Sequence, residues 1–334
     1  MSQRIGVSVC DRRFEPELAT LARQLGADGY VLALPELATD PGSGAWTVEA
    51  LRAAKAQCAD AGLPLRAIEN VPLHAMNDIV TGGPRRDAQI AFYVQTVKNM
   101  GEAGIPILGV YFAPDGVWRT SFHTPGRGGA LVSRFRLSTA ASEGNQIVGS
   151  PTPGPVSPHD LWCNYERFLE EVLPVAEASG VRLAQHPDDP PIGRVDVSDR
   201  IFTGIDAFAR AHAMASGSPA WSVQLCLGTV AETARGEDEV NDFIDYFGSR
   251  NAIAYAHLRN VAGDPTDFVE TFVNEPGRYS IVRALRRLGD VGFDGWVQDD
   301  HVPAVAGDTA YGHRARAHAI GYLQGVLDGM EQDR

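Results

Sequence analysis

Short apolar runs rich in β-branched and aromatic residues alternate along this chain with longer segments in which apolar residues recur at helical spacing. The first pattern is typical of buried strands and the second of helices that cover them. The strands are predicted at 4–9, 29–34, 64–70, 105–112, 182–187, 221–228, 253–260 and 295–301. The helices are predicted near 15–25, 47–61, 84–103, 159–179, 205–215, 237–248, 278–290 and 311–329. Because a helix follows every strand, we expect parallel strands joined by crossover helices.

The count of eight strands and eight helices favours a closed barrel over an open doubly wound sheet. Two helix-to-strand connections, 61–64 and 103–106, read Ala-Gly-Leu-Pro and Ala-Gly-Ile-Pro, with glycine where a helix ends and proline where a strand begins. After the first strand, residues 9–12 lack the glycine-rich fingerprint of dinucleotide-binding folds. We therefore predict an α/β fold in which residues 1–334 form a single (β/α)8 TIM barrel domain.

Residues 113–158 interrupt this alternation with a stretch rich in Gly, Pro, Ser and Thr. We expect a long loop insertion after the fourth strand, at the end of the barrel where enzymes of this fold carry their chemistry. This loop could be a lid over the site, a mobile excursion or an oligomer contact. Arg127, Arg134 and Arg136 in this segment could help to attract an anion.

The composition excludes some classes of partner. Lys plus Arg minus Asp plus Glu gives 29 − 42 = −13, which argues against nucleic acid or an anionic membrane as the partner. No apolar run is long enough for a secretory signal or a membrane helix, and the four scattered cysteines suit reduced thiols. We expect a cytoplasmic protein that acts on a small molecule, and a homo-oligomer is compatible with its acidic surface.

Four potential metal ligands stand at equivalent positions on the last four predicted strands: His186, Cys226, His257 and Asp300. Side chains at matching heights converge because neighbouring barrel strands face one axis. Singly, a buried cysteine is most often a small apolar residue, and a strand histidine is most often part of the core. Together, two imidazoles, a thiolate and a carboxylate suit a divalent transition metal and leave positions open for substrate oxygens. Asp299 is the rival of Asp300, and strand alternation allows only one of them to face inward.

Groups suited to proton transfer and substrate binding lie beside these ligands. His301 follows Asp300 directly, and its imidazole titrates near neutral pH. Tyr311 lies where the last loop enters the last helix, and a nearby metal or cation would have to lower the pKa of its phenol. Arg259 and Asn260 could bind a carboxylate and hydroxyl groups. Packing on the barrel and pairing with surface acids are the structural alternatives.

At these residues the chain resembles the mannonate dehydratase family of the xylose-isomerase-like barrel superfamily, from about residue 29 to 325. The most specific matches are the strings His-Pro-Asp-Asp-Pro-Pro at 186–191 and His-Leu-Arg-Asn-Val at 257–261. Weaker matches are Ile68-Glu69-Asn70-Val71-Pro72, Arg86-Asp87, Trp118-Arg119-Thr120, the strand with Cys226, and Asp300-His301.

The resemblance implies a hydro-lyase that converts D-mannonate, or a related aldonate, to the 2-keto-3-deoxy acid. It implies Mn²⁺ as the cofactor, with Fe²⁺, Co²⁺ or Zn²⁺ as alternatives, held by the four ligands named above. His301 and Tyr311 become the proton-transfer pair, in either order, and substrate binding falls to Arg259, Asn260, Glu69, His74, Trp118 and Arg119. A sugar isomerase or epimerase and a non-catalytic sugar-acid-binding protein are the alternative functions.

Several positions depart from the family pattern as the resemblance presents it. No His follows Glu270 in the segment 268–274, Tyr279-Ser280 replaces Asp-Met, Gln298-Asp299 replaces Arg-Pro, and Val302 replaces Gly. These positions differ from the family pattern, but the four metal ligands are retained. A divergent dehydratase that acts on another sugar acid is therefore also expected.

Overall fold

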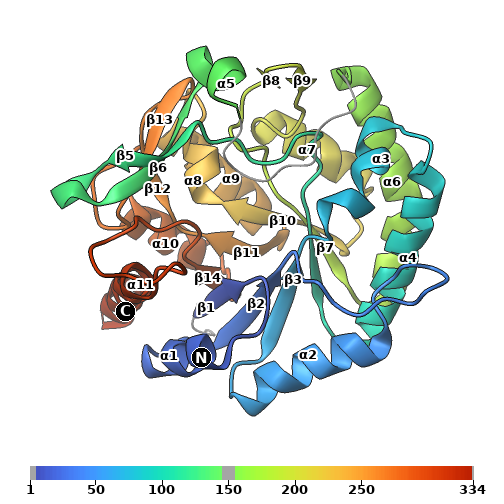
Figure 1. Ribbon diagram of the computed structural model, residues 1–334, viewed down its shortest axis with the longest axis horizontal. Helices are drawn as coiled ribbons and strands as arrows, with labels where there is room; N and C mark the ends of the chain where they lie inside the picture. Colours follow the sequence, from blue (N-terminus) through green and yellow to red (C-terminus); the bar gives the residue numbers. More distant parts are fainter. Residues whose placement is uncertain (1–4, 145–154, 333–334) are drawn as a thin grey trace.

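The computed structural model describes residues 5–144 and 155–332. Eight parallel strands close into a barrel in the order β1-β14-β11-β10-β7-β4-β3-β2, in which every strand pairs with its neighbours in the chain (Figure 1). The strands are β1 (Gly6–Asp11), β2 (Gly29–Ala33), β3 (Leu65–Glu69), β4 (Ile107–Val110), β7 (Arg182–Gln185), β10 (Trp221–Cys226), β11 (Ile253–His257) and β14 (Trp296–Gln298). The predicted (β/α)8 barrel is confirmed.

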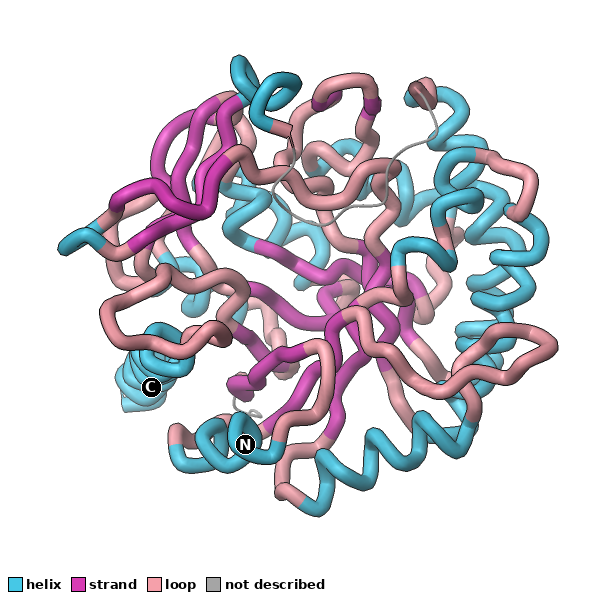
Figure 2. Tube along the Cα trace, viewed as in Figure 1, coloured by secondary structure: helices cyan, strands magenta, loops and turns pink. Residues whose placement is uncertain are grey.

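Helices surround this barrel and connect its strands (Figure 2). The long ones are α1 (Pro16–Gln24), α2 (Val48–Asp60), α4 (Arg86–Ala103), α6 (Pro158–Ser179), α7 (Ile205–Met214), α9 (Glu237–Gly248), α10 (Ile281–Asp290) and α11 (His313–Gln332). Their ends follow local chemistry: Ser157 caps α6 by accepting from the Asp160 amide, and Gly104 ends α4 with a positive φ of 69°. No helix in the described ranges is long and apolar enough to cross a membrane.

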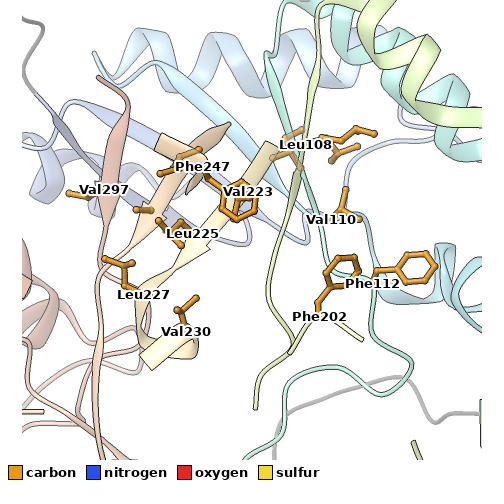
Figure 3. Close-up of a cluster of buried hydrophobic side chains, with 14 of the residues drawn as sticks. Leu108, Val110, Phe112, Phe202, Val223, Leu225, Leu227, Val230, Phe247 and Val297 are labelled. Atoms are coloured by element: carbon orange, nitrogen blue, oxygen red, sulfur yellow. The ribbon is translucent and has the colours of Figure 1, made fainter. Parts of the chain in front are cut away.

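The hydrophobic core lies mainly between the barrel and its helices (Figure 3). Alternate residues of each strand point outward into this layer, among them Val223 and Leu225 of β10. An aromatic group that includes Tyr165, Phe202 and Phe208 fills the space beside α6 and α7. A smaller apolar cluster lies inside the barrel and contains Val31, Ala67, Ile107, Ala184, Ala254, Tyr255 and Trp296. The chemistry-bearing side chains lie nearer the carboxyl ends of the strands than this cluster.

A second, antiparallel sheet stands beside the carboxyl end of the barrel, with the strand order β12-β13-β6-β5 (Figure 1). Its strands are β5 (Ser121–Pro125), β6 (Leu131–Arg136), β12 (Asn260–Asp264) and β13 (Asp267–Thr271). Two hairpins therefore form it, one after β4 and one after β11, and they join where Phe268 pairs with Phe135. Residues 113–158, expected as a loop, thus contain a hairpin and the short helix α5 (Leu137–Glu143), and 145–154 lie outside the described residues.

The arginines of the first hairpin are engaged by the second. Arg134 makes a bidentate ion pair with Asp267 at 2.7 and 2.8 Å, and Arg136 contacts the same carboxylate at 3.3 Å. Arg127 donates to Asn274 at 3.1 Å. These contacts support a role in joining the hairpins, in place of the predicted role in attracting an anion.

Candidate metal centre and active site

The four predicted metal ligands are neighbours at the carboxyl end of the barrel. One ligand atom from each of His186, Cys226 and His257 lies within 4.8 Å of the other two. The Cys226 Sγ atom is 3.4 Å from Oδ2 of Asp300, and Nδ1 of His257 is 3.7 Å from Oδ1 of the same carboxylate. Side chains that are 31 to 43 residues apart in sequence therefore form one cluster (226 − 186 = 40, 257 − 226 = 31, 300 − 257 = 43).

Strand register explains this convergence. Cys226 pairs with His257 between β10 and β11, and His257 pairs with Gln298 between β11 and β14. Asp300 lies two residues after Gln298 and therefore points to the same side. Asp299 points to the other side, where its Oδ2 atom is 2.8 Å from Nη1 of Arg316 on α11. Of the two aspartates, Asp300 therefore faces the inside of the barrel, as strand alternation predicts for one of them.

Hydrogen bonds and charges prepare these side chains as ligands. The Nδ1 atom of His186 is 2.6 Å from the carbonyl oxygen of Pro187, which leaves Nε2 as the atom with a free lone pair. Burial raises the pKa of Cys226, but the guanidinium of Arg259 and the imidazoles of His186 and His257 lower it to about 6 overall. The sulfur is therefore a thiolate at neutral pH, which is the form that binds metals.

The cluster fits a divalent cation. It offers two imidazole nitrogens, a sulfur and a carboxylate oxygen, a set found around zinc and other transition metals. Nδ1 of His257 is fully buried, forms no hydrogen bond with the residues that the structure describes and lies on the side of the Asp300 carboxylate, so it is the nitrogen of this ring that a cation could contact. The Cys226 thiolate and the Asp300 carboxylate would together balance the charge of a 2+ ion.

A layer of polar side chains lies on the other side of the His257 ring. Nε2 of His257 is 3.0 Å from the amide nitrogen of Gln298, 3.2 Å from that of Gln224 and 3.3 Å from Oε2 of Glu69. Glu69, the last residue of β3, also accepts from the Tyr255 hydroxyl at 3.3 Å. Glu69, predicted to bind substrate, therefore lies inside the barrel and contacts a candidate metal ligand.

The predicted substrate-binding residue Arg259 is held inside an ionic network. Its guanidinium donates at 2.8 Å to each of three carboxylates, those of Asp300, Glu232 and Asp189. The side chain is 1% exposed. This geometry supports a role in orienting Asp300 and in stabilising the Cys226 thiolate. The guanidinium of Arg259 is mostly occupied by these carboxylates, which does not support the predicted role in substrate binding.

Arg119, also predicted to bind substrate, has a similar environment. Its guanidinium forms a bidentate ion pair with Asp189 at 2.5 and 2.8 Å, and it contacts Glu270 at 2.7 and 3.0 Å. The side chain is 0% exposed, and the ring of Phe268 lies beneath it at 5.2 Å. Arg119 therefore connects the antiparallel sheet to the loop after β7, and the substrate contact predicted for it has no support in this geometry.

The remaining predicted substrate-binding residues are dispersed. Asn260 is buried, and its side chain donates to the Tyr279 carbonyl at 2.9 Å and accepts from the Val261 amide at 2.9 Å. The indole of Trp118 is buried and donates to Asp115 at 2.7 Å. His74 is exposed in the short 3₁₀ helix η1 (Leu73–Ala75) that follows β3. The structure brings none of these three to the four-ligand cluster through a hydrogen bond or ion pair among the described residues.

Of the two predicted proton-transfer residues, His301 borders the cluster, and Tyr311 lies beside β1. Nε2 of His301 is 3.5 Å from Oδ1 of Asp300, and its Nδ1 is 2.7 Å from Oε1 of Glu270. The Tyr311 hydroxyl donates to the carbonyl of Cys10 at the end of β1, and burial is the main cause that raises the pKa of this phenol. Tyr311 is therefore protonated at neutral pH, and His301 has one nitrogen directed toward the cluster.

Sequence reasoning missed Glu270, Gln224, Asp189 and Glu232. Gln224 stands two residues before Cys226, so strand alternation could have placed it on the inner face. Glu270 is one of two acidic residues on β13, and only the packing of two distant hairpins brings it to His301. No local pattern marks Glu232 or distinguishes Asp189 from its neighbour Asp188.

Comparisons with known proteins give one consistent family. The sequence profile of the D-mannonate dehydratase (UxuA) family matches residues 15–149 and 154–334. A mannonate dehydratase of Streptococcus suis is 30% identical over 328 residues, which cover 91% of this chain and 87% of the relative. A mannonate dehydratase of Lactococcus lactis is 27% identical over 351 residues, which cover 95% and 96% of the two chains.

Solved structures give the same result. The crystal structure of mannonate dehydratase from Streptococcus suis serotype 2 matches with a TM-score of 0.86 and 29% identity, over 98% of this chain and 95% of the other. D-psicose 3-epimerase from Clostridium cellulolyticum matches with a TM-score of 0.57 at 15% identity, over 98% and 99% of the two chains, which shows a shared fold alone. The family expected from the sequence is confirmed, and the chain belongs to the D-mannonate dehydratase (UxuA) family.

Proposed function

We propose that this protein removes water from D-mannonate, or from a closely related aldonate, to give the 2-keto-3-deoxy acid. The observation that carries the proposal is the convergence of His186, Cys226, His257 and Asp300 at the barrel mouth, in a chain of the dehydratase family. We propose Mn²⁺ as the ion that these residues hold, with Fe²⁺, Co²⁺ and Zn²⁺ as alternatives. When bound, such an ion supplies Lewis-acid stabilisation of negative charge on substrate oxygens.

The side chains around the cluster suit an elimination. Loss of water requires a base to take the proton α to the carboxylate and an acid to protonate the hydroxyl that leaves from the next carbon. His301 suits the base, because one of its nitrogens lies on the side of Asp300 and the other is held by Glu270. We assign Tyr311 the role of the acid; burial raises the pKa of its phenol, so a bound cation would have to lower that pKa before the phenol could give up its proton.

The ionic network supports this chemistry by keeping the site ordered. Arg259 contacts the partly buried Asp300, and it also contacts Asp189 and Glu232, which are almost fully buried. Buried charges of this kind are stable only when each is paired. The network therefore holds the Asp300 carboxylate in place, and the orientation of a bound substrate would depend on it.

The decisive experiment is a turnover assay on protein stripped with a chelator and reloaded with Mn²⁺. Incubation with D-mannonate should give a 2-keto-3-deoxy product, detected by NMR, and His301→Gln should lose this activity while it still binds Mn²⁺. A panel of other aldonates tests the divergent substrate. Deuterium exchange from solvent into aldoses or ketoses without loss of water would favour an isomerase, and aldonate binding without turnover in every metal form would favour a binding protein.

A further inference from the structure

We propose that Glu270 is a positioning residue that holds Nδ1–H of His301 and thereby fixes the ring with Nε2 directed toward the substrate. The inference rests on the proposed function, in which His301 transfers a proton. Its basis is a contact between two parts of the fold: Glu270 belongs to β13 of the antiparallel sheet, and His301 follows the last barrel strand. Their side chains meet at 2.7 Å between Oε1 and Nδ1.

The two ring nitrogens of His301 have different surroundings. Nδ1 faces Glu270, whereas Nε2 faces the ligand cluster, 3.5 Å from Oδ1 of Asp300. A carboxylate can only accept a hydrogen bond, so its contact with Nδ1 requires the proton to be on that nitrogen. In the neutral ring the lone pair then lies on Nε2, the nitrogen on the side of the proposed metal. Glu270 therefore selects the tautomer that a base at this position requires.

The Glu270 carboxylate is itself fixed in place. Oε1 also accepts from Nη2 and Nε of Arg119 at 2.7 and 3.0 Å, and the residue is 6% exposed. Arg119 is fixed in turn by the bidentate pair with Asp189 and by the Trp118 carbonyl at 2.8 Å. An acceptor held this firmly also fixes the plane of the imidazole, because the ring must align its N–H with one oxygen. The same carboxylate thus sets both tautomer and orientation.

A purely structural role is the competing explanation. Glu270 lies 3.7 Å from Arg259 as well as beside Arg119, so it contributes to balancing two buried guanidinium charges. Those arginines also contact Asp189, and Arg259 contacts Glu232 and Asp300. A residue that only balanced charge would affect the free energy of unfolding without affecting the proton position on His301. The two roles therefore give different measurable results.

The test measures the His301 tautomer directly, by ¹⁵N NMR of metal-free protein with labelled histidine. The His301 signals are assigned by their loss in His301→Gln. At a pH at which the ring is neutral, wild-type protein should show a protonated Nδ1 and an unprotonated Nε2. Glu270→Ala should shift the ring toward the Nε2–H tautomer, and the isosteric Glu270→Gln, which keeps an acceptor oxygen, should fall between the two.

Turnover supplies the second measurement. Glu270→Ala should lower kcat by about 100-fold, since general base catalysis contributes on the order of 10²–10⁴, while KM for the aldonate and the Kd for Mn²⁺ change less than about threefold. Glu237→Gln is the matched control, because Glu237 pairs with Arg283 at 2.6 Å on the surface between α9 and α10. It should leave the tautomer and kcat unchanged.

The outcomes separate the two proposals. A His301 tautomer that is the same in wild type, Glu270→Ala and Glu270→Gln overturns the positioning role. A kcat that falls only as far as the folded fraction falls also overturns it. Absence of turnover by wild-type protein with every aldonate overturns the proposed function instead, and the NMR experiment on metal-free protein still decides the role of Glu270.

Discussion

The side-chain amide of Gln224 lies 3.2 Å from Nε2 of His257 within the barrel, and Gln224 precedes the candidate ligand Cys226 by two residues on β10. Gly109 makes room for it, since a Cβ atom there would stand 2.9 Å from Oε1 of Gln224. Metal-binding histidines generally depend on a partner at their second nitrogen, which sets the ring orientation. The Glu69 carboxylate can accept from this nitrogen, and the side-chain amides of Gln224 and Gln298 pack against it.

Replacing Gln224 with Met keeps the length of the side chain and removes the amide. We predict that Gln224→Met weakens Mn²⁺ binding by roughly 10–100-fold, because His257 loses an orienting contact. Calorimetric titration of the metal-free protein measures this. Gln57→Met, on the exposed face of α2, is the matched control. Equal affinities for the Gln224 variant and wild type would show that the remaining two partners suffice to hold the ring.

Metal removal should lower the stability of the folded protein. At a free Mn²⁺ concentration 100 times Kd, binding to the folded state alone stabilises it by about 2.7 kcal/mol, and a chelator should abolish this gain. Cys226→Ser should reduce the gain, because a hydroxyl does not ionise as the thiol does at a pKa of about 6. Thermal unfolding with and without metal checks both. Cys163→Ser, at an exposed site on α6, should behave like wild type.

The ion pair of Asp78 with Arg85 predicts a pH-dependent contribution to stability. Asp78 is 7% exposed, and its carboxylate accepts from Nε of Arg85 at 3.0 Å and from the Arg85 amide at 2.8 Å. The side-chain hydrogen bond from Arg85 is the main cause that lowers the pKa of Asp78 in the folded state. The carboxylate therefore stabilises the fold above its unfolded-state pKa of about 4, and this contribution is lost as pH falls through the lower folded-state value.

Asp78→Asn should accordingly cost roughly 1–2 kcal/mol at pH 7, a figure reduced for the exposure of the arginine. The difference from wild type should shrink as the pH falls below about 4. Urea unfolding at several pH values measures it. A difference that stays constant down to the acid limit would mean that the asparagine acts through packing and not through charge.

The aromatic group beside α6 and α7 should dominate local packing energy. Phe202 is fully buried, with its ring centroid 4.9 Å from that of Tyr165 and 5.1 Å from that of Phe208 (Figure 3 shows its position). Phe202→Ala should therefore reduce the free energy of unfolding by about 3–5 kcal/mol, with an unchanged m-value. Phe122→Ala is the control, since Phe122 on β5 is 38% exposed and should change stability by about 0.5 kcal/mol or less.

The barrel and its ligand cluster could be predicted because both depend on regular strand geometry. Alternation along a strand and equal height around the axis were enough to bring Cys226 near His257 and to turn Asp300 inward. The predicted strand 253–260 was too long, because β11 ends at His257 and the chain then turns into the hairpin that begins at Asn260. That turn also explains why Asn260 is directed toward Tyr279 and away from the ligands.

The contacts that hold the active-site side chains could not be predicted, because they join segments with no regular relation in sequence. Arg119 and Glu270 are 151 residues apart and meet only because two hairpins form one sheet. An arginine in a motif suggests a substrate anion, and only coordinates reveal that acids of the same protein already surround Arg119 and Arg259. For the same reason, no pattern in the sequence indicated that Glu270 contacts His301.

The antiparallel sheet beside the barrel has a consequence for how such a protein can diverge. The interior holds a charged pair of which Arg119 stands just before the first hairpin and Glu270 stands near the end of β13 in the second. Deleting or reshaping one hairpin alone would remove one partner of this buried ion pair and unbalance the charges of the interior network, which is destabilising. The two insertions should therefore be gained, lost and altered together in descendants of this chain, as a single inherited unit contributed by two separate loops.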